Sequence, residues 1–404
     1  MKIIYIHQYF NTPEMSGGTR SYEMARRLVD MGHEVNMVTS WREDDGWTGW
    51  FETEEAGIRV HWLPVAYSNR MRYSERVRAF FRFAVGAARK AASLPADVVF
   101  ATSTPLTIAL PGAYAARRQK APMVFEVRDL WPELPIAMGA LRNPLARSAA
   151  HRLERFAYWR SSHVVALSPG MRDGVFRAGY PSEQITVIPN SSDLDFFDPS
   201  RHETGTFRAA HPELGNAPLV VYTGTMGVIN GVTYLPRIAA AARARGSKVQ
   251  FVLVGRGSEE QAVREEAERL GVLGENFHLF PPVPKAEVPN VLADADLALS
   301  FFIDLEPMWA NSANKFFDAL ASGTPVAINY GGWQKDLLEE SGSGLVIPPN
   351  DPDKAATALE EFIGDRERVV QAGRAARQLA ERRFDRDLLA QQLEGVLSSA
   401  VVGK

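Results

Sequence analysis

The chain has 404 residues, 46% of them hydrophobic, and a formal net charge of −3 from 45 basic and 48 acidic side chains. At about 150 residues per domain, this length favours two or three folded units. The charge balance argues against a protein that coats nucleic acid, and the absence of cysteine excludes disulfides, thiolate catalysis and cysteine-based metal centres. The eight histidines lack HExxH or similar spacing, so the sequence predicts no metal site.

The chain begins with the pattern of a strand, a glycine-containing loop and a helix. Residues 2–7, KIIYIH, predict a buried strand, and Gly17 and Gly18 lie just before a helical pattern that Gly32 closes. The GxGxxG spacing is missing, which disfavours a nicotinamide cofactor. The two glycines predict either a plain turn or a close approach of backbone to a phosphate or sugar. The first residues do not resemble a signal peptide, so we expect a cytoplasmic protein.

Residues 34–39 start a series of strand patterns that alternate with helical segments. Further strands are expected at 58–63, 98–102, 123–127, 163–167 and 185–189. This alternation predicts a doubly wound parallel sheet, in which ligands bind beyond the carboxyl ends of the strands. The candidate site loops are therefore 102–104, 128–131 and 168–170. Arg128 and Asp129 directly follow a buried strand and form either a structural ion pair or a catalytic pair.

Residues 68–90 carry seven arginine or lysine residues against one glutamate, with phenylalanines between them. Basic and aromatic residues on one helix predict an interfacial helix at anionic lipid. The alternative is an ordinary solvated helix whose phenylalanines face the core. The side chains that would contact the membrane are Arg70, Arg72, Arg76, Arg78, Phe80 and Phe81. The nearby uncharged run 98–116 is interrupted by prolines, so it predicts strand, loop and helix and not a membrane span.

A second alternating series begins after residues 202–218, which show little periodicity. Its strands are expected at 219–222, 249–254, 277–280, 297–302 and 326–329. We therefore predict an α/β fold with two facing, Rossmann-like, doubly wound halves and a cleft between them. The expected domains are residues 1–198 and 199–382, with a final helix at about 383–404 that packs back on the first domain.

The stretch 306–332 carries the densest local signal. A short helix with one apolar face is expected there, with polar residues at its cap positions, Lys315 in its first turn and Asp318 one turn further. The residues expected around the cap are Asn311, Ser312 and Asn314. Exposed N–H groups at a helix start bind anions, so this arrangement suits a nucleotide diphosphate with its ribose. The alternative is a helix start that binds only water.

The order of the motifs resembles a known family. The sequences MARRLVDMGHEVNMVT, SPGM, VIPNSSDLDFF, YTGTMG, FVLVGRG and NKFFDALASGTP look like glycosyltransferase family four, the retaining enzymes of GT-B fold. EVRDLWPE together with NKFFDALASG is similar to the branch that adds acetamido sugars, N-acetylfucosamine among them, in bacterial O-antigen and capsule assembly. The resemblance covers nearly the whole chain.

The resemblance implies transfer of a sugar from a nucleotide diphosphate sugar, which we expect to be UDP-linked, with retention and without an essential metal or cofactor. Asp318 would hold the ribose, and Gly17 and Gly18 would close over the phosphate. Lys315, Arg256, Glu306 and Arg128 are the expected catalytic groups. The other donor-binding residues would be Gly224, Thr225, Asn230, Val283, Asn311, Ser312, Ala313 and Asn314. The implied acceptor is lipid-linked or a saccharide, and the enzyme would work at the inner face of the cell membrane.

The chain departs from the family pattern in the sugar site. The usual pair of glutamates eight positions apart is Ala310 and Asp318 here, and Glu306 is the nearest carboxylate to the missing one. The usual arginine and lysine after the first strand of the second half are Thr225 and Asn230. Arg128 occupies the position of the common histidine. Two alternatives therefore stay open, a nucleotide-sugar epimerase and a catalytically degenerate partner protein.

Overall fold

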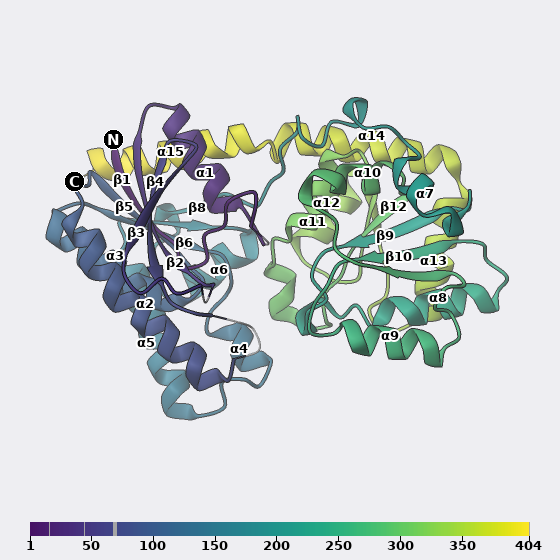
Figure 1. Ribbon diagram of the computed structural model, residues 1–404, viewed down its shortest axis with the longest axis horizontal. Helices are drawn as coiled ribbons and strands as arrows, with labels where there is room; N and C mark the ends of the chain where they lie inside the picture. The colour runs from purple at the N-terminus through teal and green to yellow at the C-terminus, as the bar shows by residue number, and fades with distance from the viewer. Residues whose placement is uncertain (16, 44, 68–70, 404) are drawn as a thin grey trace. The chain divides into compact units, whose positions relative to one another are not determined.

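The structure, a computed structural model, describes residues 1–15, 17–43, 45–67 and 71–403 (Figure 1). The chain forms two compact units: the first holds Met1–Pro189 with the residues from Asp387 onward, and the second holds Asn190–Arg386. Each unit is built on its own, mostly parallel sheet with helices packed against it. The predicted α/β class with two Rossmann-like halves is confirmed, whereas the cleft between them stays a prediction.

The sheet of the first unit has the strand order β3-β4-β2-β1-β5-β6-β7-β8 in the described chain. All of its described pairs are parallel except β3 with β4. Ile3 and Tyr5 of the central strand pack in one buried core with Met24 of the first helix and Leu393 of the last. The strands are β1 (Lys2–Ile6), β2 (Glu34–Trp41), β3 (Phe51–Glu55), β4 (Ile58–Pro64), β5 (Val98–Thr102), β6 (Met123–Val127), β7 (His163–Ala166) and β8 (Ile185–Val187).

The helices of the first unit connect these strands, and the last one comes from the end of the chain. The chain termini lie on the same unit (Figure 1). The helices are α1 (Arg20–Asp30), α2 (Tyr73–Ser93), α3 (Ala109–Gln119), α4 (Glu133–Ala137), α5 (Pro144–Trp159), α6 (Pro169–Arg177) and α15 (Arg386–Val402). The uncharged run 98–116 forms β5 and most of α3, as predicted. No helix in the described ranges is both long and apolar enough to cross a membrane.

The second unit has the strand order β11-β10-β9-β12-β13-β14 among its described residues, and all these pairs are parallel. Its strands are β9 (Leu219–Thr223), β10 (Gln250–Val254), β11 (Phe277–Phe280), β12 (Leu297–Ser300), β13 (Val326–Ile328) and β14 (Gly344–Val346). Its helices are α7 (Thr206–Ala210), α8 (Tyr234–Ala244), α9 (Glu260–Arg269), α10 (Val288–Ala293), α11 (Asn314–Ala321), α12 (Trp333–Ser341), α13 (Pro352–Gly364) and α14 (Arg366–Arg383).

Two strands were not predicted from the sequence, and both lie at sheet edges. β3 reads FETEE and buries no residue fully, and β14 spans three half-buried residues. An edge strand pairs on one side only and tolerates charged side chains, so it lacks the apolar run that identifies a buried strand. The sequence analysis could therefore find the central strands and not these two.

The two units divide after Pro189, whereas the sequence analysis expected the division after residue 198. The backbone N–H of Asn190 donates to the Ser312 hydroxyl at 3.0 Å, and the Ser192 hydroxyl donates to Asp318 at 2.7 Å. The aperiodic segment 202–218 also belongs to the second unit. Phe207 and Leu214 within it are buried in a hydrophobic cluster of the second unit.

Candidate active site

The loops after β9 and β10 meet at the carboxyl edge of the second sheet. The N–H of Gly224 donates to Val254 O at 2.9 Å, and the N–H of Met226 donates to Arg256 O at 3.0 Å. A Cβ at Gly255 would lie only 1.9 Å from Gly224 O, which no side chain tolerates. The glycines of YTGTMG and FVLVGRG therefore allow two backbone segments to pack closely where a ligand is expected in this fold.

Lys315 of α11 lies over these glycine-containing loops. Its Nζ is 4.7 Å from the centroid of the Tyr222 ring, and its Cε would be 3.1 Å from a Cβ placed on Gly224. Burial lowers the pKa of Lys315 to about 8, with the carboxylate of Asp318 acting in the opposite direction. Such a partly desolvated ammonium gains from any anion that binds beside it. The structure thus places Lys315 beside Gly224, and the donor-site role that the sequence analysis gave to both stays a prediction.

The start of α11 differs from the prediction in its cap. Ala313 and not a polar residue occupies the N-cap position, and it makes no side-chain capping bond. Asn311 Oδ1 instead accepts the N–H of Ser312 at 3.1 Å, and the buried Ser312 hydroxyl accepts from Asn190. Phe316 is the first residue of the helix whose N–H donates a hydrogen bond to a backbone carbonyl, that of Ala313. Because no side chain among the described residues caps the helix, the N–H groups of Asn314 and Lys315 are placed to receive an anion.

Asp318 lies three residues after Lys315 on the same helix. Its Oδ1 accepts the hydroxyl of Ser192 at 2.7 Å, and burial raises the pKa of its carboxyl group. Neither the sequence nor its spacing predicted Ser192 as a partner, because the two residues are 126 positions apart. This hydrogen bond orients the carboxylate of Asp318, which can still accept further hydrogen bonds.

The other predicted donor-site residues of the second unit differ in how exposed they are. Thr225 is exposed, and the side chain of Arg256 is 71% exposed with Glu260 at 3.9 Å. Glu306 is also exposed, and no hydrogen bond or ion pair in the described chain joins it to Lys315 or Arg256. These side chains are accessible to a ligand but are not assembled with Lys315 into one hydrogen-bonded group.

Asn230 and Val283 serve the fold of their own loops. Asn230 is buried, and its Oδ1 accepts the N–H of Gly227 at 3.2 Å, which closes the turn after β9. Val283 is partly buried against the hydrophobic cluster that contains Phe207. Asn230 is uncharged, so it supplies no positive charge beside the Gly224 loop. The positive charge beside the Gly224 loop comes from Lys315.

In the first unit, Gly17 and Gly18 are exposed and lie before α1. Gly17 has φ +127°, and a Cβ there would be 2.6 Å from Asn11 Nδ2. The same Asn11 amide donates to Gly18 O at 3.2 Å. The loop thus needs glycine for its backbone conformation and is held by a side chain, and both features are compatible with an approach to phosphate or sugar.

A buried ion pair, which sequence reasoning missed, fixes the position of α1 below this loop. Arg20 Nη2 lies 2.9 Å from Glu126 Oε1, and the two side chains are 3% and 0% exposed. Arg20 also donates to the carbonyls of Ile188 and Pro189, just after β8. A glutamate in the otherwise apolar strand MVFEV was a usable signal, because a buried carboxylate requires a partner.

Arg128 and Asp129 do not form the predicted pair in the described structure; each has a different partner. Arg128 Nη1 lies 3.2 Å from His7 Nε2, and Asp129 accepts the Thr104 hydroxyl at 2.7 Å. Because arginine only donates, His7 Nε2 must accept, so its Nδ1 carries the proton and donates to the Ser21 hydroxyl. Burial, with Arg128 next, lowers the pKa of His7 and keeps this ring neutral. Sequence reasoning missed His7.

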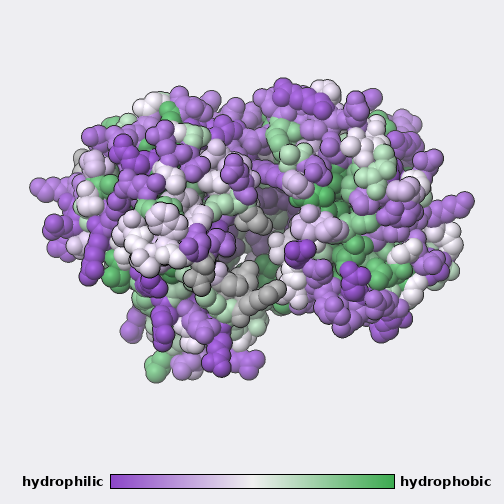
Figure 2. Space-filling model, in the orientation of Figure 1, coloured by the Kyte–Doolittle hydropathy of each residue, from purple (hydrophilic) through white to green (hydrophobic). Residues whose placement is uncertain are grey.

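The predicted membrane-contact residues of α2 and the segment before it separate into different environments. Arg72, Arg78 and Phe81 are exposed, whereas Phe80 is half-buried and stacks on Tyr67 with ring centroids 5.9 Å apart. The Arg76 guanidinium also contacts Tyr67, since its Nε donates to the phenol at 3.1 Å. Arg70 lies outside the described residues. Figure 2 shows a mostly hydrophilic face over α2 with small hydrophobic patches. Arg72, Arg78 and Phe81 are therefore the predicted residues that are exposed and stay candidates for membrane contact.

Comparison with known proteins assigns the family. Residues 17–191 match the family described as "Glycosyl transferase 4-like domain", and residues 217–365 match "Glycosyl transferases group 1". The chain belongs to the group 1 glycosyltransferases of GT-B fold. The glycosyltransferase is 24% identical over 308 residues to the GDP-mannose-dependent alpha-(1-6)-phosphatidylinositol monomannoside mannosyltransferase of Mycobacterium tuberculosis, covering 74% of this chain and 75% of the relative.

Solved structures support the same fold at low sequence identity. Anabaena HepE in complex with UDP and glucose has a TM-score of 0.74 at 19% identity, covering 99% of the glycosyltransferase and all of the HepE chain. Sucrose-phosphate synthase from Thermosynechococcus elongatus has a TM-score of 0.80 at 16% identity, and each chain is fully covered. Likeness at this identity establishes the fold and not the donor sugar or the acceptor.

Proposed function

We propose that this glycosyltransferase moves a sugar, with retention, from a UDP-linked donor to a lipid-linked or saccharide acceptor in bacterial surface polysaccharide assembly. An N-acetylated hexosamine or deoxyhexosamine is the proposed sugar, on the resemblance of EVRDLWPE and NKFFDALASG to that branch. The observation that carries the proposal is Lys315, which lies beside Gly224 at the uncapped start of α11. We expect the reaction to occur at the cytoplasmic face of the membrane.

The proposed chemistry needs charge stabilisation at the departing diphosphate. A cation and oriented N–H groups at the place where negative charge develops lower the barrier without a metal in the donor site. Lys315 supplies the cation, and Asn314 and Lys315 supply N–H groups. Arg128 of the first unit, held by the neutral His7, is the proposed acceptor-side cation. The carboxylate role that Ala310 cannot fill would fall to Glu306.

The function is tested by incubating the purified protein with UDP- and GDP-linked sugars and a lipid-linked or saccharide acceptor. Release of the nucleotide diphosphate together with a new glycoside of retained anomeric configuration supports the proposal. An altered sugar that stays on its nucleotide would instead identify an epimerase. Binding of the nucleotide without turnover of any acceptor would identify a degenerate partner protein.

Replacing Asp318 with asparagine is expected to weaken donor binding. The carboxylate is oriented by Ser192, and its replacement by an amide leaves one acceptor oxygen for the ribose hydroxyls. Loss of one hydrogen bond to a charged group costs about 1.5–3 kcal/mol, so the Kd for UDP should rise about 10- to 100-fold. Isothermal titration calorimetry measures this Kd for the wild type and the variant. Asp336→Asn on the exposed first turn of α12 is the control, and equal Kd values for both variants contradict the assignment.

A membrane contact of α2 is expected to be weak and salt-sensitive. Each exposed arginine contributes about 1 kcal/mol at an anionic surface and is screened over about 8 Å at physiological salt. The triple variant Arg72→Ser, Arg78→Ser, Phe81→Ser should lose co-sedimentation with anionic vesicles and keep turnover of a soluble acceptor. The matched control is a triple variant of α6, Arg172→Ser, Phe176→Ser, Arg177→Ser, which should keep co-sedimentation with anionic vesicles. If the wild type ignores anionic vesicles at low salt, α2 is an ordinary solvated helix.

A further inference from the structure

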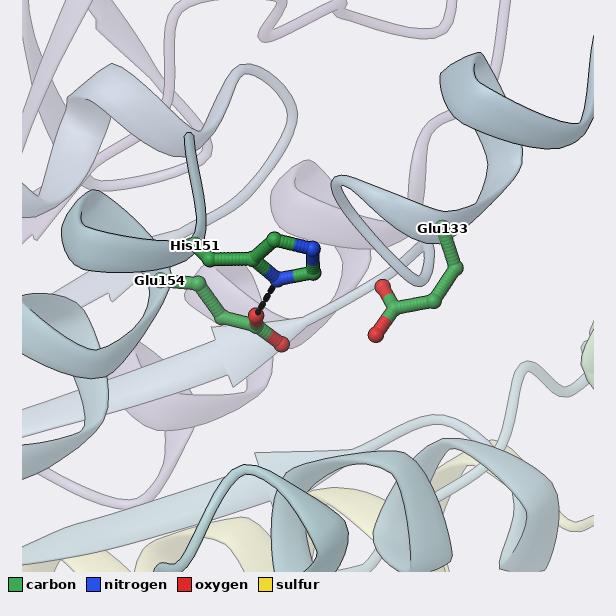
Figure 3. Close-up of side chains that lie close together, drawn as sticks. All are labelled: Glu133, His151 and Glu154. Atoms are coloured by element: carbon green, nitrogen blue, oxygen red, sulfur yellow. Dashed lines mark hydrogen bonds and ion pairs between the residues drawn. The ribbon is translucent and has the colours of Figure 1, made fainter. Parts of the chain in front are cut away.

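Three side chains of the first unit that could ligate a cation converge at α4 and α5. Glu133 is the first residue of α4, and His151 and Glu154 lie one turn apart on α5 (Figure 3). One ligand atom from each lies within 4.8 Å of the other two. The spacing of three residues between His151 and Glu154 places both on the same face of the helix, toward Glu133.

The polar groups of this cluster are only partly satisfied by the protein. Glu154 is buried; its Oε2 lies 3.2 Å from His151 Nδ1, and its Oε1 accepts the Tyr158 hydroxyl at 3.3 Å. Glu133 Oε2 is buried and accepts no hydrogen bond from any described residue. Burying an acceptor without a partner costs free energy, and a second carboxylate close by adds repulsion. The cluster therefore has more acceptor capacity than donors.

The electrostatics agree with this geometry. The ligand oxygens of Glu133 and Glu154 lie within 4.8 Å of each other, with the His151 imidazole beside them. One imidazole cannot neutralise two carboxylates, because it carries at most one positive charge. A divalent cation would neutralise both and satisfy the free Glu133 oxygen at once.

We propose that Glu133, His151 and Glu154 bind one divalent cation of the Zn²⁺ class, with an open position for water. An imidazole with two carboxylates suits such borderline cations better than Mg²⁺ or Ca²⁺, which prefer all-oxygen sites. Bonds of about 2.0–2.2 Å in tetrahedral geometry bring ligand atoms to about 3.3–3.6 Å from one another. Separations below 4.8 Å need only small rotamer shifts to reach that range.

The ion has a route to the site and a structural consequence. The His151 side chain is 46% exposed, so its ring can turn and the cation can enter from solvent. Glu133 ends the loop that carries Arg128 and Asp129 after β6. Coordination would tie the start of α4 to α5 and hold that loop, which in the proposed function lies on the acceptor side. This role is independent of the donor site and does not require metal in the transfer step.

The test uses the full-length protein, purified without a histidine tag and treated with EDTA. We expect Zn²⁺ to bind with one-to-one stoichiometry in calorimetry, and Co²⁺ to give visible absorption bands of a four- or five-coordinate site. His151→Ala should weaken Zn²⁺ binding more than tenfold, because even outer-shell partners of a metal site are worth about 10- to 100-fold. His211→Ala, which removes another histidine paired with a glutamate, should leave binding unchanged.

A second variant separates metal binding from a simple structural role. Glu133→Gln keeps the side-chain volume and removes one of two neighbouring carboxylates. It should raise the thermal midpoint of the metal-free protein and abolish the upward shift that Zn²⁺ causes in the wild type. Absence of stoichiometric Zn²⁺ binding by the wild type, or equal binding by the wild type and His151→Ala, overturns the proposal.

Discussion

Replacing Lys315 with alanine is expected to lower kcat about 10²- to 10³-fold while weakening UDP binding far less. Removing one preorganised group that stabilises developing charge has this cost, since the group contributes mainly in the transition state. Lys315 meets the geometric requirement because its ammonium lies against Tyr222 and Gly224 at the uncapped start of α11. Steady-state kinetics and titration with UDP separate the two effects.

The control for this variant is Lys335→Ala on α12, whose ammonium forms an exposed pair with Glu339 at 3.7 Å. It should keep wild-type kcat. The pH dependence gives an independent check. A diphosphate favours the protonated lysine, whose pKa of about 8 in the free protein means that UDP binding weakens as pH rises through 8. Lys315→Arg should remove this dependence, because arginine stays charged. Unchanged kcat in Lys315→Ala contradicts the assignment.

Replacing Arg20 with methionine is expected to destabilise the first unit by about 3–5 kcal/mol, because it leaves Glu126 buried without a counter-charge. The loss is large against a typical total stability of about 5–15 kcal/mol. Arg20 also satisfies the Ile188 and Pro189 carbonyls, so three partners lose their donor together. The urea midpoint of the first unfolding transition, followed by fluorescence and circular dichroism, measures the effect.

The matched control is Arg269→Met, because Arg269 pairs with Glu266 at 2.8 Å on an exposed helix surface. Exposed pairs contribute at most about 1 kcal/mol, so its midpoint should change little. The double variant Arg20→Met, Glu126→Leu should recover part of the lost stability, since it removes the uncompensated charge. If Arg20→Met unfolds at the same urea concentration as Arg269→Met, the buried pair does not stabilise the unit.

The predicted elements succeeded where local pattern and local structure coincide. Central strands such as β1 are apolar runs because both of their edges and faces are covered, and that requirement is visible in one window of sequence. The edge strand β3 has no such requirement, so its three glutamates concealed it. Lys315 was predicted in the first turn of its helix, where it lies, but the cap was assigned to polar residues, of which Ser312 instead bonds to Asn190.

The sequence by itself determined the parallel central strands of both sheets, the glycine-dependent loops after β9 and β10, and Lys315 at the start of a helix, because periodicity and turn chemistry are local. Only the tertiary structure decided which polar groups neutralise one another. Arg20 meets Glu126 across 106 positions and Ser192 meets Asp318 across 126. Likewise, Glu133 reaches the pair on α5 only after the chain has folded. Such partners follow from the packing of distant segments, which no spacing along the chain encodes.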